Sequence, residues 1–349
     1  MKRLKEIFKS IFKLRNFAFV FGISILTYMI YKIGIENIFD NVKQIGWWFF
    51  AIISTWGVGY LVNALAWYMI INDDIERRVK YSEVLRLTIS GYALNYITPF
   101  GLAGGEPYRI LELKKHISTE KATSSVILYA MMHVCSHFFF WLATIILIAW
   151  FVELSLGVSI AMSIIVLMCL ILIFLFFRGY KKGLVMTLTR FFGKVPFLRK
   201  RIKKLKPSTI ERLNIIDTQI KGLKGKRQKT FYFALSLEFL ARLVNAVEIL
   251  LIIYAMGYYA NYVDALIIVG LSSLFANILF FSPMQLGTRE GGLMLAFKTI
   301  GLAPGLIISV SMIKRIRELF WIGIGLLLMK FCFQKNPVIP LDIETKKDE

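Results

Sequence analysis

Two segments decide the fold of this chain: Pro99-Phe-Gly-Leu-Ala-Gly-Gly-Glu106 and Pro283-Met-Gln-Leu-Gly-Thr-Arg-Glu290. Each begins with a proline, has a leucine three residues later and reaches a glutamate after seven. Both interrupt stretches that otherwise have the composition of membrane helices. A broken helix that carries a carboxylate at bilayer depth is costly unless it is buried in protein or lines a wet cavity. We therefore expect two helical hairpins inside the membrane; the alternative is a pair of ordinary Pro/Gly loops at its surface.

The composition indicates a membrane protein. Hydrophobic residues make up 57% of the 349 residues, and the mean hydropathy is +0.64. Six long apolar runs approach or exceed the roughly 20 residues that a helix needs to cross the hydrocarbon layer. They are Phe17–Ile35, Trp47–Ile71, Ser124–Trp150, Leu154–Phe177, Phe231–Met256 and Gly305–Phe333. No segment of comparable length alternates with the two-residue period of a barrel strand, so the sequence predicts an all-α polytopic protein.

The positive charge predicts the orientation. Seventeen Lys and Arg residues and only two acids lie within 178–229, and the N-terminus is also basic. Such clusters stay on the cytoplasmic side and attract anionic lipid headgroups. We therefore expect a cytoplasmic N-terminus (1–16), one transmembrane domain (17–335) with a basic cytoplasmic loop (178–229), and a cytoplasmic tail (336–349) in the cell membrane. The segment Glu36–Lys43 is expected to be a loop on the other side. The net charge of +21 thus reflects membrane topology, and we expect no nucleic-acid partner.

The two short segments fit the topology as re-entrant hairpins. Val84–Thr98 has 15 residues before the first break, about 22 Å of helix and too short for a crossing. The chain returns along Glu106–Leu113. The second hairpin enters along Tyr262–Phe281 from the opposite face and returns along Glu290–Ile300. The prediction is therefore about six full transmembrane helices and two hairpins of opposite orientation, as in inverted-repeat transporters. The residues expected at the breaks are Pro99, Gly101, Gly104, Gly105, Pro283 and Gly287.

One predicted span carries a stripe of polar residues. Glu238, Arg242, Asn245 and Glu248 follow one another at steps of four, three and three, so they share a helix face. A Glu238–Arg242 pair would offset part of the cost of these charges and leave Glu248 in need of a partner. The stripe is either an internal ion pair that fixes helix packing or a polar wall of a pathway.

The last span carries a positive excess. Lys314, Arg315 and Arg317 surround a single acid, Glu318. Further arginines, Arg109 and Arg289, belong to the hairpin segments. Because guanidinium groups suit bidentate phosphate recognition, this inventory favours an anionic or zwitterionic headgroup that contains phosphate. The residues predicted to bind substrate are Glu106, Arg109, Glu238, Arg242, Glu248, Arg289, Glu290 and Arg315.

Two histidines, His133 and His137, lie one helical turn apart, with Tyr129 on the same face. They suit packing, proton handling or a metal, although the sequence HVCSH lacks the acid of the zinc-protease motif. Nucleophile-elbow, P-loop and dinucleotide-binding motifs are absent from the sequence. We therefore expect no metal, no cofactor and no catalytic residues.

The hairpin segments resemble the two signatures of the lysylphosphatidylglycerol synthase transmembrane (flippase-like) family. The first signature is matched by Asn95-Tyr-Ile-Thr-Pro-Phe-Gly-Leu-Ala-Gly-Gly-Glu-Pro-Tyr-Arg109 and the second by Pro283-Met-Gln-Leu-Gly-Thr-Arg-Glu-Gly-Gly292. Arg315 resembles the arginine of the helix that follows. Met284 and Gln285 stand where the family usually has glycines. The resemblance covers about residues 20 to 335.

This resemblance implies a polytopic lipid flippase or translocase-like fold and leaves the choice between transporter and enzyme open. Its partners would be membrane lipids, either an anionic or zwitterionic phospholipid or a lipid-linked phosphate. Larger members append a soluble aminoacyl-transfer domain, and this chain is expected to be a stand-alone member without it. The alternatives are a membrane-embedded transferase that acts on a lipid-linked donor and a scaffold without transport. The oligomeric state stays open, a homo-oligomer included.

Overall fold

The computed structural model describes residues 30–72, 79–98, 104–152, 155–183, 207–222, 228–278 and 287–331, together with six isolated positions. Pro99, Gly101 and Pro283, which we expected at the hairpin breaks, lie outside the described residues. The basic N-terminus (1–16) and the tail (336–349) also lie outside them.

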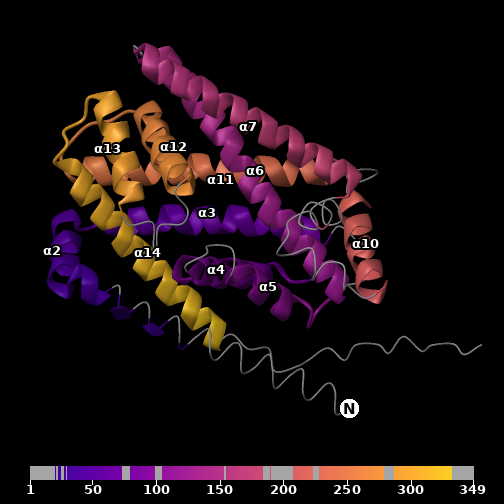
Figure 1. The fold of residues 1–349 in the computed structure, drawn as a ribbon. Helices are drawn as coiled ribbons and strands as arrows, with labels where there is room; N and C mark the ends of the chain where they lie inside the picture. The colour runs from indigo at the N-terminus through magenta and orange to yellow at the C-terminus, as the bar shows by residue number, and fades with distance from the viewer. Residues whose placement is uncertain are drawn as a thin grey trace, which may run out of the picture.

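The described part is helical and contains no strand (Figure 1). Its helices are α2 (Ile35–Ile45), α3 (Trp48–Ile71), α4 (Tyr81–Ile97), α5 (Gly105–Leu113), α6 (Thr119–Phe151), α7 (Leu156–Lys182), α10 (Pro207–Gly222), α11 (Gln228–Ala255), α12 (Tyr262–Ile278), α13 (Thr288–Ile300) and α14 (Leu306–Phe331). The predicted all-α polytopic class is confirmed.

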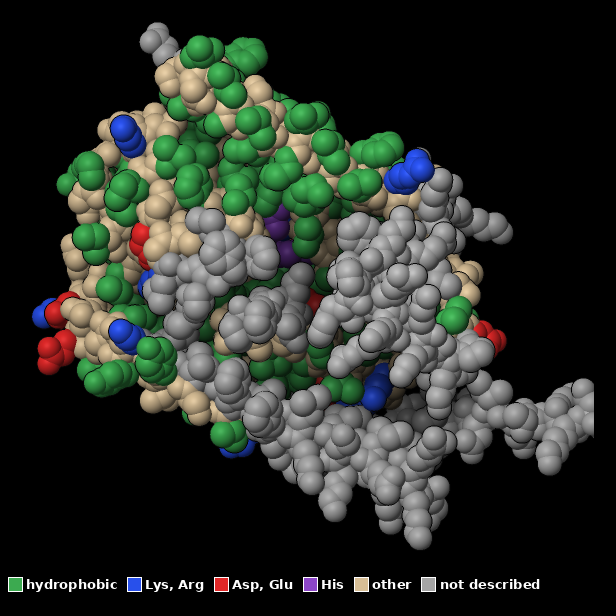
Figure 2. Space-filling model, in the orientation of Figure 1, with side chains coloured by type: hydrophobic (Ala, Val, Ile, Leu, Met, Phe, Trp, Pro, Cys, Tyr) green, Lys and Arg blue, Asp and Glu red, His purple; other side chains and the backbone are tan. Residues whose placement is uncertain are grey.

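Several of these helices suit a membrane. Within the described residues, α3, α6 and the segment Leu156–Tyr180 of α7 are long and apolar enough to cross one. Helices α11 and α14 have 28 and 26 residues but carry the charged stripes noted above. Hydrophobic side chains cover much of the face in Figure 2, over α7 in particular. A surface of this kind is stable only against lipid or another apolar surface.

Two segments expected to be loops contain helices. Residues 36–43 form most of α2, an amphipathic helix that begins after Gly34, whose φ of 85° makes the turn. Part of the predicted basic loop 178–229 forms α10, which packs against α6 and α7. Both segments have an apolar face that a helix can bury against the protein. The buried residues on these faces are Ile45 in α2 and Ile216 and Ile220 in α10.

Helices α4 and α5 form the first hairpin. The Gly105 N–H donates to Asn95 Oδ1 at 2.7 Å, and farther along α5 the Arg109 guanidinium donates to the carbonyls of Leu87 and Thr88 at 3.3 and 3.1 Å. The start of α5 thus contacts the end of α4, and a later residue of α5 contacts an earlier part of α4. The two helices are therefore antiparallel. Gly91 allows this approach, because a Cβ there would collide with the Arg109 guanidinium.

At the open end of the first hairpin, where α4 starts and α5 ends, the two helices are connected by a network of ion pairs. Glu83 and Arg86, in the first two turns of α4, pair with each other, and Arg86 also lies 3.5 Å from Glu112 of α5. Lys115 pairs with Glu112 at 2.8 Å, and the His116 ring lies 3.6 Å from Glu83. This network ties the start of α4 to the end of α5.

Helices α12 and α13 form the second hairpin. Gly292 of α13 lies so close to α12 that a Cβ would come within 2.7 Å of the Ser272 Cα. Gly287, with a φ of 80°, leads into α13, and its N–H donates to the Glu290 carboxylate at 2.8 Å. The glutamate of the second short segment thus caps its own helix.

The two halves of the chain repeat each other. Helices α4 and α12 both have 17 residues and begin with a tyrosine. Tyr81 Oη donates to the carbonyl of Leu61 on α3, and Tyr262 Oη donates to that of Leu243 on α11, both at 2.8 Å. Close helix contacts repeat as well. Gly325 of α14 packs on Ile89 of α4, and Gly270 of α12 packs on Thr144 of α6. Ile89 to Gly270 and Thr144 to Gly325 are both steps of 181 residues.

The repeats are inverted relative to each other. Helices α3 and α11, which occupy equivalent places, pack side by side (Figure 1). Trp56 of α3 donates to Glu248 of α11, while Gly59 faces Asn245. Residue numbers rise along α3 as they fall along α11, so these equivalent helices run in opposite directions. Two large apolar cores each draw on both halves: one includes Trp67, Leu87 and Leu326, and the other includes Ile52, Leu271 and Phe297.

We predict that Gly91→Ala and Gly105→Ala destabilise the protein. A Cβ at Gly91 meets Arg109, and a Cβ at Gly105 meets the Gly91 carbonyl, so each change forces the hairpin helices apart. Overpacking of this kind costs about 1–3 kcal/mol. The melting temperature in detergent measures the effect. Gly291→Ala is the matched control, since a Cβ there meets nothing within 4 Å; equal melting temperatures for all three variants would contradict the prediction.

Candidate functional site

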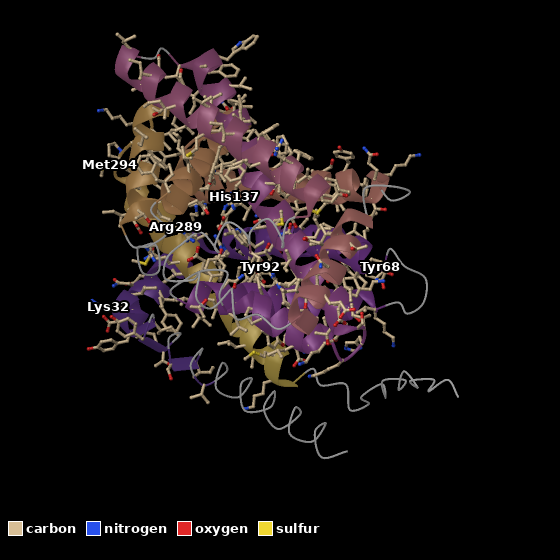
Figure 3. All side chains as sticks on the ribbon, turned by 45° about the vertical axis from the view of Figure 1, so that its right-hand side comes forward. Lys32, Tyr68, Tyr92, His137, Arg289 and Met294 are labelled. Carbon is tan, nitrogen blue, oxygen red and sulfur yellow. The ribbon has the colours of Figure 1, made fainter. Side chains whose placement is uncertain are left out.

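The eight predicted site residues fall into two clusters. The first ionic cluster joins α5, α6 and α11, and the second joins α11, α13 and α14. The first contains Glu106, Arg109, Glu238 and Arg242; the second contains Glu248, Arg289, Glu290 and Arg315. Figure 3 shows Tyr92, His137 and Arg289 towards the middle of the molecule, whereas Lys32 and Tyr68 lie nearer its edges. Helix α11 contributes to both clusters.

In the first cluster, Arg109 is enclosed within the first hairpin. Its side chain is 1% exposed and pairs with Glu106 at 2.9 Å. Its other donors bind the α4 carbonyls described above, and three aromatic rings surround its guanidinium at 4.9–5.5 Å from their centroids. These rings belong to Trp67, Tyr92 and Tyr129. Cation–π contacts and hydrogen bonds together offset the cost of burying this charge.

Glu238 and Arg242 do not form the expected direct pair. Glu238 instead lies 2.7 Å from His133 Nδ1 of α6. Arg242 donates to Ser136 Oγ at 2.8 Å and to the His133 carbonyl at 2.6 Å, and it contacts the His137 ring at 3.0 Å. Helix α6 packs directly against α11, so it offers both side chains closer partners than they offer each other.

In the second cluster, Glu248 has a partner that its own helix does not supply. Arg317 of α14 donates to both Glu248 oxygens, at 2.7 and 3.2 Å, and Trp56 Nε1 of α3 donates at 2.8 Å. The Arg317 guanidinium also lies 3.8 Å from the centre of the Trp56 ring. Glu248 and Arg317 are buried and Trp56 is half-buried. The group joins α3, α11 and α14, and charge-assisted hydrogen bonds of this kind are the strong ones.

The second hairpin connects to α14 through two more ion pairs. Arg289 pairs with Glu318, and Glu290 pairs with Arg315 at 2.5 Å. Ser311 Oγ also donates to Glu290 at 2.7 Å. The neighbouring residues Arg289 and Glu290, adjacent in the sequence motif, therefore bind different residues of the same helix.

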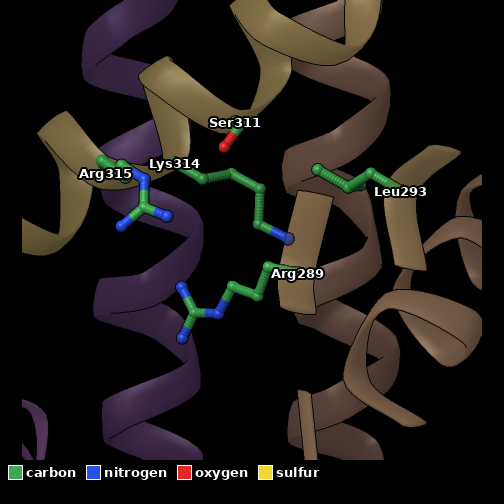
Figure 4. Close-up of a pocket in the computed structure, with 5 residues that line it drawn as sticks. All are labelled: Arg289, Leu293, Ser311, Lys314 and Arg315. Carbon is green, nitrogen blue, oxygen red and sulfur yellow. The ribbon is translucent and has the colours of Figure 1, made fainter. Parts of the chain in front are cut away.

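A small hollow, with room for about one water molecule, lies between α13 and α14. Its lining residues are Arg289, Leu293, Ser311, Lys314 and Arg315. Figure 4 shows the side chains of Lys314, Arg289 and Arg315 converging on this space. Lys314 forms no hydrogen bond or ion pair with another described residue. Among the described residues of this region, three carboxylates (Glu248, Glu290, Glu318) face four cations (Arg289, Lys314, Arg315, Arg317), which leaves an excess of one positive charge.

Aromatic rings connect the two clusters. Tyr92 contacts the first cluster, and Tyr96, one turn later on α4, stacks near Arg289 of the second at 5.9 Å. Tyr60 of α3 lies 5.5 Å from Tyr92 and 4.9 Å from Trp321 of α14, centroid to centroid. The two clusters thus share a wall formed by α3, α4 and α14.

The sequence prediction omitted several residues that the geometry makes central. Lys314 and Arg317 were recognised as unusual charges but not assigned to the site, and His133 had no assigned partner. Tyr92 and Asn95 gave no signal, because aromatic and single amide residues are common in membrane helices. Within the described residues no group of three potential metal ligands occurs.

Comparison with known proteins identifies the family. The chain matches the model for the lysylphosphatidylglycerol synthase transmembrane region over residues 16–325. No curated protein and no solved structure matches it. Since this match covers most of the chain, including both hairpins and both ionic clusters, the protein belongs to the lysylphosphatidylglycerol synthase transmembrane-region family.

Proposed function

We propose that this protein moves a phosphate-bearing lipid between the two leaflets of the cell membrane. Its family is related to membrane lipids in general, and three cations that line the α13–α14 hollow are suited to contact a headgroup phosphate. The observation that carries the proposal is the unpaired Lys314 beside Arg289 and Arg315 in that hollow.

Phosphate suits the hollow for a physical reason. An unpaired cation inside an apolar protein has a high free energy, and a substrate that carries an anion offsets this cost when it binds. Arginine offers two parallel donors to phosphate oxygens, and lysine adds a point charge. Because Arg289 and Arg315 already hold carboxylates, the phosphate meets donors that are oriented in advance, with Lys314 as its main counter-charge.

The two hairpins give the headgroup a route. We place the two hairpins inside the bilayer, entered from opposite faces, with both termini in the cytoplasm. The inverted relation of the two halves supports this placement, since it puts equivalent hairpins on opposite sides. Arg109 holds the two helices of the first hairpin together, because its guanidinium donates to α4 carbonyls and pairs with Glu106.

We predict that Lys314→Met slows lipid exchange about tenfold or more, since a hydrogen bond to a charged group contributes about 1.5–3 kcal/mol. The measurement uses purified protein in liposomes with fluorescent phosphatidylglycerol, whose outer-leaflet label is bleached by an impermeant reductant. Lys298→Met is the matched control, because Lys298 lies on α13, which also lines the hollow, but its side chain is exposed. Exchange at the protein-free rate for the wild type would overturn the proposal.

We also predict selectivity for phosphate. Fluorescent phosphatidylglycerol should exchange at least about tenfold faster than fluorescent glucosylceramide, which has a sugar headgroup without phosphate, because only the former neutralises Lys314. The same liposomes and bleaching assay measure both lipids. Equal acceleration of the two lipids would remove the proposed role of the hollow, and conversion of a lipid-linked phosphate into a product would instead indicate a transferase.

A further inference from the structure

The first ionic cluster contains a histidine–carboxylate pair for which the proposed lipid movement gives no role. His133 Nδ1 lies 2.7 Å from Glu238 Oε2 and 3.0 Å from Tyr92 Oη. A single ring nitrogen thus lies between a carboxylate and a hydroxyl. When Glu238 is ionised, Nδ1 must carry the hydrogen; when Glu238 is protonated, Nδ1 can accept it. The same contact therefore accommodates a proton on either partner.

Glu238 is poorly satisfied as an anion. Its side chain is 1% exposed, and its second oxygen, Oε1, is buried without a hydrogen-bond partner among the described residues. A buried carboxylate normally accepts several hydrogen bonds, and an unpartnered polar atom at this depth is costly. An added proton neutralises the carboxylate and so lowers that cost. Glu106 differs, because its carboxylate is paired directly with Arg109.

Protons can reach this pair. The His133 side chain is 22% exposed, so it lies between Glu238 and the outside of the helix bundle. A proton from water would enter at His133 and be shared with Glu238.

The charges around the His133–Glu238 pair nearly cancel, so one added proton changes the net charge of this region substantially. The titratable and charged groups that face the pair come from every helix packed around it: Tyr60 on α3, Tyr92 on α4, Glu106 and Arg109 on α5, Tyr129 and His137 on α6, and Arg242 on α11. Glu106 and Glu238 balance Arg109 and Arg242. Proton uptake therefore leaves a net charge of +1, which matches the single negative charge of an anionic phospholipid.

We propose that His133 and Glu238 form a proton-binding site and that one proton travels with each anionic headgroup. This inference rests on the proposed lipid movement. The proton enters from water on the more acidic side, is held by the pair, and leaves to water on the other side, while no bond of the lipid changes. The link to the headgroup is α4, whose Tyr92 contacts His133 and whose Tyr96 contacts Arg289 of the hollow.

The test uses wild-type protein in liposomes that contain fluorescent phosphatidylglycerol in both leaflets, with an acidic lumen and the membrane potential held at zero by valinomycin and equal K⁺. Lipid and protons should leave the lumen side together. The fraction of label that an external reductant bleaches should rise, with a limit of about tenfold in leaflet ratio per pH unit. A pH-sensitive dye in the lumen should report alkalinisation during the same period.

Glu238→Gln and His133→Gln should each abolish the gradient-driven rise and the dye signal. His116→Gln is the matched control, since His116 lies at the open end of the first hairpin beside Glu83; this variant should keep both signals. Should a substituted protein fail to fold, the wild-type dye measurement still decides the question.

The two proposals fail in different ways. Wild-type protein that exchanges lipid without a gradient, yet shows neither lipid accumulation nor alkalinisation with one, would overturn the proton coupling and leave the lipid movement intact. Wild-type protein that exchanges no lipid under any condition would overturn both.

Discussion

The structure depends on the rule that every charge inside an apolar protein needs a partner, and here the partners come from other helices. Arg317 binds Glu248, Arg289 binds Glu318, and both pairs bridge separate helices. Removal of one member of such a buried pair costs about 3–5 kcal/mol, because the other charge is left uncompensated. These pairs therefore fix how α11, α13 and α14 face one another, and the α13–α14 hollow follows from that arrangement.

Small residues allow the charges to meet. Gly91 lets Arg109 lie against α4, and Gly292 lets α13 lie against α12. In a membrane, helix association gains little from the hydrophobic effect, so close backbone approach and interhelical polar contacts supply the energy instead. Each half of the chain uses the same combination of glycine contact and ion pair. The repeat thus preserves a way of packing, although its sequence identity is slight.

The sequence predicted the helices and hairpins because their signals are local: apolar length, a proline and neighbouring glycines. It could not predict that Glu248 binds Arg317, because the two lie 69 residues apart and their meeting depends on the rotation of α11 and α14. The expected Glu238–Arg242 pair was wrong for the same reason. A spacing of four residues shows which side chains share a face, but not whether α6 offers a closer partner. Whether the eight predicted residues bind substrate stays a prediction.

The internal repeat also explains why the two clusters differ in kind. The step of 181 residues that relates Ile89 to Gly270 carries His133 onto Lys314 and His137 onto Glu318. Each half therefore presents a basic side chain at the same place on the helix that follows its hairpin. In the second half this side chain is a lysine, a counter-charge suited to phosphate. In the first it is a histidine, whose charge depends on its surroundings. One scaffold used twice thus accounts for both proposed sites, the anion site in the second half and the proton site in the first, and coupled movement requires both.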